Sequence, residues 1–230
     1  MQPDDFLDVL ATTRAIRRYR PEPIPDEDLN KILYTATRAP SGSNRQPLRY
    51  LVLRDGEGAR AAKSLLGVSF RRGWAEKTVS DGYNSGSGTA SNTPKARFAQ
   101  SMQDYVDNFE QIPVVILLCY RPRHHSVADG GSIFPAAQNL LLAARALGYG
   151  GVITGWHRAV EGELAELLGI PEGIDIAATL TLGKPQGNHG PVRRRPLAEV
   201  VYEDHWDSSP TWATDPADAR FTQAGPPTDT

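Results

Sequence analysis

The sequence contains a single cysteine, Cys119, so no internal disulfide can form. Cys119 lies within the apolar run 114–120, where a buried and inert thiol is the usual outcome. No apolar run approaches the roughly 18 residues that a membrane-spanning helix requires. Residues 1–7 lack the basic start and long apolar stretch of a secretory signal. We therefore expect a cytoplasmic protein with no membrane partner.

An excess of charge of either sign is also missing. The chain has 25 Lys and Arg against 27 Asp and Glu, a formal net charge of -2. No global positive field would attract nucleic acid, so any anion site must be local. A length of 230 residues with 40% apolar content suits one globular core. We predict a single domain over residues 1–205, followed by a C-terminal arm or tail over 206–230.

The signatures of several enzyme classes are absent. The glycine cluster at 148–151 follows a predicted helix and precedes a predicted strand, which reverses the Rossmann order. No glycine loop carries a Walker lysine, and there is no Gly-x-Ser-x-Gly elbow. The histidines show no spacing typical of metal ligands, so we expect no metal; they are His124, His125, His157, His189 and His205.

Hydrophobic periodicity predicts a mixture of helices and strands. Helices are predicted from Phe6 toward Thr13 and over 26–40, 102–109, 133–147 and 161–168, and strands over 49–54, 113–120, 152–156 and 174–182. The helix at 133–147 is apolar or small nearly all round, which favours a central or dimer-interface position. The run 113–120 is typical of a strand buried on both faces. Residues 80–95 are predicted to form a long loop or lid.

Two arginine-rich segments suit an anion. In the stretch 13–19, Arg14 and Arg17 follow a predicted helix and can chelate a phosphate, to which Thr13 adds a hydroxyl. In 191–196, extended geometry would place Arg193 and Arg195 on one side and Arg194 on the other. Taken alone, the stretch 13–19 favours a solvated charged face, and 191–196 could also be surface charge.

A third segment, 39–47, is a proline-bounded turn. It presents backbone amides together with the side chains of Asn44 and Gln46. Such groups can hydrogen-bond a ribityl chain and the edge of a flavin. This segment therefore favours a polar, planar ligand over a simple surface turn.

Together these segments resemble the nitroreductase family, and the resemblance covers nearly the whole chain from Phe6 to about His205. The stretch 13–19, with the proline-rich residues after it, resembles the family's phosphate motif, and 39–47 resembles its Ala-Pro-Ser-x-x-Asn-x-Gln-Pro motif. Residues 135–150 are similar to its central dimer helix, and 182–185 to its last core strand. Three positions depart from the pattern: Thr13 and Ala15 replace an arginine and a serine, and Leu48 replaces a tryptophan.

The resemblance implies an α+β fold with a mixed sheet flanked by helices, in an interlocked homodimer with flavin at the interface. It implies FMN as cofactor and NADPH or NADH as electron donor, with ping-pong hydride transfer through flavin N5 to a small aromatic, quinone, nitro or activated-alkene acceptor. No side chain need act as a general acid, so no catalytic residue is named. Reductive dehalogenation, flavin fragmentation and non-enzymatic flavin binding or sensing remain alternatives on the same fold.

The resemblance also implies which residues contact the cofactor. The expected phosphate contacts are Thr13, Arg14, Ala15, Arg17 and Arg193 or Arg195; the expected ribityl and ring contacts are Pro40, Ser41, Asn44 and Gln46; and the expected backbone contacts to the ring are Ile153, Thr154 and Gly155. The region 67–109 is least like the family and is expected to shape the acceptor pocket. There, Phe70, Trp74, Tyr83 and Tyr105 could stack on an aromatic acceptor, although local packing of most of them is slightly favoured.

Overall fold

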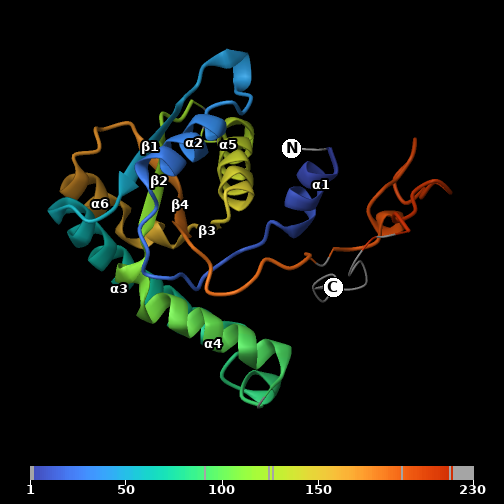
Figure 1. The fold of residues 1–230 in the computed structure, drawn as a ribbon, viewed down its shortest axis with the longest axis horizontal. Coiled ribbons are helices and arrows are strands. Elements are labelled where there is room, and N and C mark those ends of the chain that lie inside the picture. Colours follow the sequence, from blue (N-terminus) through green and yellow to red (C-terminus); the bar gives the residue numbers. More distant parts are fainter. Residues whose placement is uncertain are drawn as a thin grey trace. The chain divides into compact units, whose positions relative to one another are not determined.

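The computed structural model describes residues 3–90, 92–123, 125, 127–192, 194–217 and 219. The chain divides into two compact units, one made of 15–188 and the other of 1–14 together with 189–230 (Figure 1). The second unit contains the helix α1 (Pro3–Thr12) and a short 3-10 helix at Leu197–Glu199. The domain boundary expected near residue 205 stays a prediction.

A four-stranded sheet forms the centre of the 15–188 unit. Its strands are β1 (Leu48–Leu53), β2 (Val114–Tyr120), β3 (Gly150–Thr154) and β4 (Asp175–Gly183). Their order is β1-β2-β4-β3, and each neighbouring pair is antiparallel. In the described residues, parallel pairing is confined to a single bridge between Ala15 and Gly151. The expected α+β class is confirmed, with antiparallel strands predominating.

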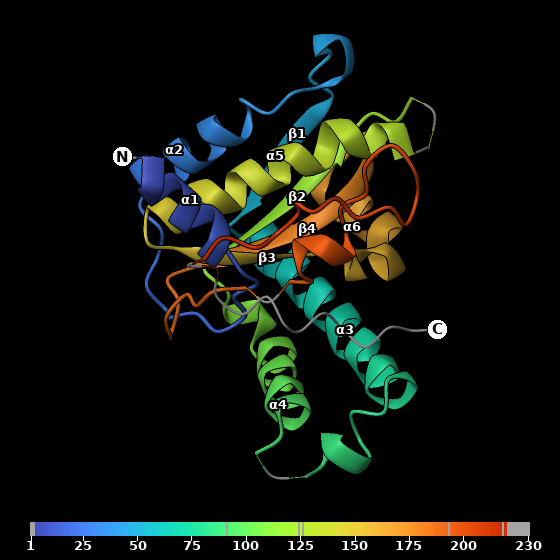
Figure 2. The ribbon, with the colours of Figure 1, turned by 90° about the vertical axis from the view of Figure 1, so that its right-hand side faces the viewer.

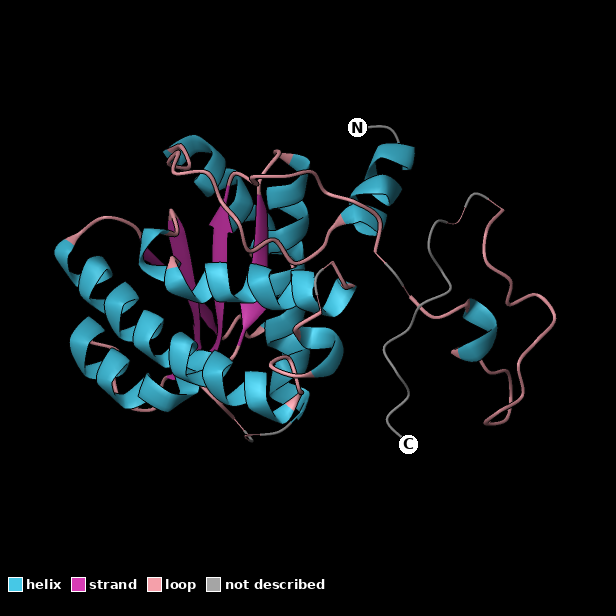
Figure 3. Cartoon of the chain, turned by 90° about the horizontal axis from the view of Figure 1, so that it is seen from below, coloured by secondary structure: helices cyan, strands magenta, loops and turns pink. Residues whose placement is uncertain are grey.

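Helices cover both faces of this sheet (Figures 2 and 3). Side chains alternate across a strand, and β2 therefore sends Ile116 and Leu118 to one core and Val115 and Leu117 to the other. The first core is covered by α2 (Asp26–Ala36) and α5 (Val127–Ala146), and the second by α3 (Glu57–Ser80), α4 (Pro94–Asp107) and α6 (Glu161–Leu168). The prediction that 113–120 is buried on both faces is confirmed.

The helix α3 was not predicted from the sequence. Its buried stripe is Ala62, Leu66, Phe70 and Trp74, one residue in every four. Three glycines, at 58, 67 and 73, weaken the helical pattern. A Cβ at Gly67 would lie 2.2 Å from Glu110 Oε1, so a larger residue there would displace the Glu110 side chain. The predicted loop is present between Ser80 and Pro94, and it follows this unpredicted helix of 24 residues.

Within the described chain, only one side of the helix α5 is covered by other residues. Ile133, Ala137 and Leu140 are buried against the sheet, whereas the ring of Phe134 is 50% exposed. The sequence indicated cover on most sides, so part of that cover is not supplied within the described chain. None of the described helices is long and apolar enough to cross a membrane.

Candidate functional site

A small pocket of about 120 Å³ lies at the β3 edge of the sheet. Because β3 is the last strand in the order, one side of its backbone is not paired with β4. On that side, the Gly151 carbonyl accepts a hydrogen bond of 2.9 Å from the Ile16 amide. Backbone groups alternate in direction along a strand, so Ile153 presents its amide and carbonyl at the same edge. Ile153 and Thr154, which the resemblance assigns to the side of a flavin ring, line the pocket. Their contact with a flavin stays a prediction.

Arg17 also lines this pocket, and its guanidinium lies 5.5 Å from the ring centroid of Phe98. The chain around Arg17 is fixed by Tyr19, whose hydroxyl is 2.5 Å from the Ile16 carbonyl and 2.8 Å from Thr181 Oγ1. Cation–π contact of this kind holds a guanidinium flat against an aromatic ring. Arg17 was expected at a phosphate, whereas here it lies among the residues expected at the ring.

Four aromatic side chains contribute to the pocket wall. Trp74, Phe98, Tyr105 and Trp156 line it. Trp74 is held in place because its Nε1 donates a 2.9 Å hydrogen bond to the Gln103 side chain. Flat, rigid walls of this type favour a planar ligand over a flexible one.

Of the four aromatic residues expected at an acceptor, two line the pocket and two do not. Trp74 and Tyr105 line it. Phe70 is fully buried and packs on Phe109 at a centroid distance of 4.3 Å, so its ring belongs to the core. Tyr83 lies behind Trp74, at a centroid distance of 5.2 Å, and supports the wall without reaching the pocket.

The pocket combines neutral phenols with positive charge. Burial raises the pKa of Tyr19 and Tyr105, an effect that the nearby Arg17 and the hydrogen bonds to Thr181 oppose without cancelling. Both hydroxyls therefore stay protonated at neutral pH. Lys77 adds a second cation, and its ion pair with Asp81 raises its pKa. No carboxylate lines the pocket itself, so its charge suits an electron-rich ligand.

The second predicted segment, 39–47, forms a strained turn. Ser43, Asn44 and Gln46 have φ angles of 53°, 52° and 51°, a left-handed conformation that costs roughly 1–3 kcal/mol per residue. Side chains within the turn hold it: Ser41 Oγ accepts from the Gln46 amide at 3.0 Å, and the Gln46 side chain donates to Asn44 Oδ1 at 3.1 Å. Backbone strain maintained in this way is typical of binding sites.

This turn lies far from the β3 pocket within one chain. It leads into β1, which is separated from β3 by β2 and β4. Three strand spacings correspond to roughly 14 Å. The turn is instead joined to α5, where the Gly42 amide donates a 3.0 Å hydrogen bond to Ser132 Oγ. The residues expected around one flavin are therefore divided between opposite edges of the sheet.

The expected phosphate residues outside 15–188 lie in the other compact unit. There, the Val192 amide donates to the Ala11 carbonyl at 3.2 Å, which brings the arginine-rich stretch beside the end of α1 and Arg14. Thr13 Oγ1 donates its proton to the Val9 carbonyl at 2.6 Å and has none left for a phosphate. Arg195 lies 3.7 Å from Glu199. Arg193 lies outside the described residues.

Lys77, Phe98 and Ser132 are site residues that the sequence analysis missed. Lys77 lies three residues after Trp74, and positions i and i+3 share one face of a helix. Phe98 and Ser132 carry no such signal, because their partners Arg17 and Gly42 are distant in the sequence. In the described chain, no group of three or more His, Cys, Asp or Glu side chains could hold a metal ion.

Comparison with known proteins agrees with this geometry. Residues 10–184 match the model of the nitroreductase family. A protein of Archaeoglobus fulgidus, whose name pairs NADH dehydrogenase with NAD(P)H nitroreductase, is 31% identical over 191 residues, covering 80% of this chain and 87% of that protein. An NADPH-flavin oxidoreductase of Vibrio harveyi is 26% identical over 204 residues, covering 88% of this chain and 75% of that protein.

A solved structure gives the same result at the level of the fold. A nitroreductase from Desulfovibrio desulfuricans, crystallised in complex with FMN, is 27% identical and superposes with a TM-score of 0.62. The superposition covers 90% of this chain and 99% of that chain. The family match extends over well more than half of the sequence and includes the β3 edge, the strained turn and α5. The chain therefore belongs to the nitroreductase family of oxidoreductases.

Proposed function

We propose that this chain is an FMN-dependent NAD(P)H oxidoreductase that reduces a small aromatic, quinone, nitro or activated-alkene acceptor. The observation that carries the proposal is the β3-edge pocket, in which two cations, aromatic walls and a free backbone edge meet without a carboxylate. The Desulfovibrio desulfuricans relative binds FMN, and the Vibrio harveyi relative is named for NADPH and flavin. When bound, FMN would supply the hydride chemistry, while the protein binds and orients it.

The pocket is small compared with a flavin. Its volume is about 120 Å³, which is below the roughly 150 Å³ of a cavity known to hold a benzene-sized molecule. A bound flavin would therefore place only the edge of its ring system in this pocket, beside the open edge of β3. Arg17 makes the potential of this pocket positive, whereas the charge of Lys77 is balanced by its ion pair with Asp81. A positive potential favours an electron-rich ring edge.

The other contacts of the flavin are assigned to the remaining motif residues. We assign the phosphate to Arg14 with Arg193 or Arg195, and to backbone groups near Ala15. The ribityl chain and the outer part of the ring are assigned to the 39–47 turn, through Pro40, Ser41, Asn44 and Gln46. Gly155 follows Thr154 directly and extends the backbone edge beside the ring.

We propose that a second copy of the chain completes the site. The strained turn and the β3 pocket lie at opposite edges of one sheet, so a single flavin contacts both only if they come from different copies. The turn is bonded to α5 through Ser132, and α5 exposes half of the Phe134 ring. A homodimer formed through α5 covers that ring and presents the turn to its partner.

An absorbance spectrum of the purified protein tests the proposal. A bound flavin gives a band at about 450 nm, which anaerobic NADPH or NADH should bleach. The nucleotide that bleaches it faster identifies the donor. A protein that takes up no flavin after incubation with FMN contradicts the proposal, and a flavin that neither nucleotide bleaches supports a binding or sensing protein instead.

A further inference from the structure

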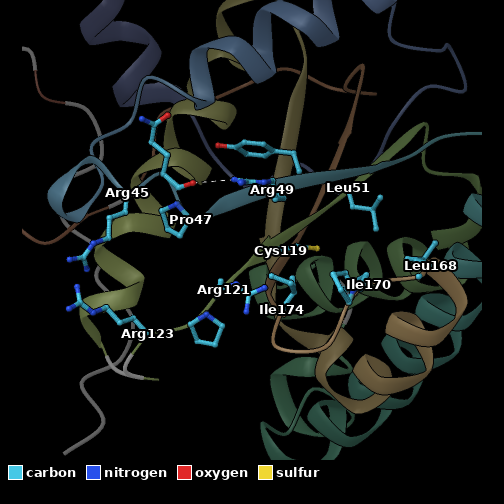
Figure 4. A pocket seen from close by; sticks show the side chains of 15 residues that line it. Arg45, Pro47, Arg49, Leu51, Cys119, Arg121, Arg123, Leu168, Ile170 and Ile174 are labelled. Carbon is cyan, nitrogen blue, oxygen red and sulfur yellow. Dashed lines mark hydrogen bonds between the residues drawn. The ribbon is translucent and has the colours of Figure 1, made fainter.

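A second cavity, of about 760 Å³, lies at the opposite edge of the sheet beside β1 (Figure 4). Four arginines line it: Arg45 and Arg49 come from the turn and from β1, and Arg121 and Arg123 follow β2. The end of α6 and the loop after it complete the wall with Leu168, Ile170 and Ile174. This volume lies within the range of small-molecule sites, about 300–1,000 Å³.

The arginines of this cavity are not neutralised by acidic side chains. None of the four forms an ion pair with any carboxylate in the described part of the chain, and no aspartate or glutamate lines the cavity. Arg49 donates to the carbonyls of Gln46 and Leu48, at 3.2 and 2.7 Å. In a chain with a net charge of -2, this is a local concentration of positive charge. Arginine presents a planar fork of donors that matches carboxylate and phosphate oxygens.

The cavity has a charged side and an aliphatic side. Figure 4 shows Arg45 and Arg123 on one side, with their guanidinium groups directed toward each other, and Leu168 and Ile170 on the other. The lining contains no aromatic ring other than that of Tyr50. Aliphatic walls of this kind bury a flexible hydrocarbon rather than hold a flat ring.

We propose that this cavity binds a small amphipathic anion, whose carboxylate or phosphate head is held among Arg45, Arg121 and Arg123 while its aliphatic body lies against Ile170 and Ile174. The ligand class differs from the planar acceptor and from FMN. The proposal goes beyond the proposed function and does not depend on it. Gln46 lines this cavity and also belongs to the strained turn, so a bound anion lies next to the residues assigned to the flavin of the partner.

Methyl NMR of the full-length holoprotein with labelled isoleucines tests the proposal. Octanoate and octyl phosphate are titrated separately, with octanol as the uncharged probe and hexanoate as the shorter one. The methyl signals of Ile170 and Ile174 should shift, while that of Ile153 in the β3 pocket should not. Two fewer methylenes should weaken binding about fifteenfold, since each buried methylene contributes roughly fourfold. Comparing the two octyl anions identifies the preferred head group.

Three single variants test the role of the arginines. Arg121→Gln and Arg123→Gln should each weaken binding of the preferred anion about tenfold. Arg72→Gln, which removes an exposed α3 arginine outside the cavity, should leave binding unchanged. The proposal is overturned if all three variants bind equally, if octanol binds as well as octanoate, or if Ile153 responds instead of Ile170 and Ile174. The flavin band of each variant shows separately whether the proposed function holds.

Discussion

The two edges of the sheet use the same type of cation in different surroundings. At the β3 edge, Arg17 is partly buried against the ring of Phe98, in a pocket of about 120 Å³ with aromatic walls. At the β1 edge, four exposed arginines surround a cavity of about 760 Å³ with aliphatic walls. Positive charge alone therefore does not identify a ligand, because the adjacent apolar groups decide whether a flat ring or a flexible chain fits.

The two edges also differ in the contacts that fix their residues in place. The β3 pocket is fixed by long-range contacts, with Tyr19 and Tyr105 both bonded to Thr181. The residues beside the β1 cavity are fixed by local bonds within a strained turn. A pocket fixed by long-range contacts depends on the core beneath it, so core substitutions should affect the β3 edge first.

The largest effect is expected from Phe70→Ala. This ring is fully buried and packs against Phe109 and Trp156, beneath the β3 pocket. Removing it should lower the free energy of unfolding by about 3–5 kcal/mol. Urea denaturation followed by circular dichroism measures the change. Val68→Ala, at a side chain 57% exposed on the same helix, is the matched control and should cost well under 1 kcal/mol.

A loss below about 1 kcal/mol for Phe70→Ala would contradict the position of this ring in the core. Protein that retains its fold allows a second comparison. Binding at the β3 pocket should be weakened, because Trp156 lines that pocket and loses a packing partner. Binding of an anion at the β1 cavity should change much less.

Phe134→Glu should have the next largest effect, because it places a charge on the exposed face of α5 that we assign to the dimer. A buried, unpaired charge costs several kcal/mol, so the dimer should dissociate at micromolar concentration. Analytical ultracentrifugation with flavin absorbance measures mass and cofactor together. A monomer that still binds FMN as tightly as the native protein would show that one chain suffices for the site.

A third prediction concerns Arg17 at the β3 edge. Arg17→Ala removes a charge-assisted contact worth about 1.5–3 kcal/mol, so FMN affinity should fall roughly ten- to a hundredfold. Fluorescence titration of the apoprotein with FMN measures the affinity. Arg18→Ala, which removes the exposed side chain next in sequence, should change the affinity less than twofold. Equal affinities of the two variants would remove Arg17 from the site.

The parts of the fold that follow from local patterns were predictable from the sequence. The strand Val114–Tyr120 and the helix Glu161–Leu168 were placed within a residue, because unbroken apolar runs and clear breakers mark them. The turn at 39–47 was located by its polar and proline residues, whereas its left-handed backbone was not predicted. Ile153 and Thr154 were placed through the family resemblance, and the structure supplies the free strand edge beside them.

Contacts between distant segments were not predictable. The cation–π contact of Arg17 with Phe98 joins residues from two elements, and neither position carries a signal of the other. The arginines of the β1 cavity are similarly divided between 45–49 and 121–123, and only the antiparallel pairing of β1 with β2 brings them together. The helix α3 was not predicted because glycines and charged residues lie between its buried positions and obscure the four-residue repeat.

A fourth prediction concerns the loss of folding stability at acidic pH, caused by a histidine near the β3 edge. His157 follows β3, is fully buried, and has its Nε2 2.8 Å from the Ile176 carbonyl, while Nδ1 has no hydrogen-bond partner in the described structure. Burial lowers the pKa of His157 below its usual value. The unfolded chain therefore binds this proton more readily than the folded chain, and stability falls as the pH drops below about 6.5.

The slope attributable to His157 is at most about 1.4 kcal/mol per pH unit. Urea denaturation of the native protein and of His157→Gln, at pH 7.5 and 5.5, isolates it, since glutamine keeps a side-chain donor for Ile176 but does not titrate. The native protein should lose more stability than the variant over this interval. Equal losses would mean that protonation of His157 does not oppose folding.

The smallest effect is expected from Arg121→Gln on FMN. Arg121 is not assigned to the flavin of either copy, so this variant should change FMN affinity less than twofold, because an exposed charge that makes no direct contact is screened by solvent and salt. The same fluorescence titration used for Arg17→Ala gives both affinities under one set of conditions. The ratio of the two affinity losses decides between two arrangements. A much larger loss for Arg17→Ala means that the two edges bind different ligands. Equal losses would mean that both arginines serve one extended flavin site and that the distinction between the edges does not hold.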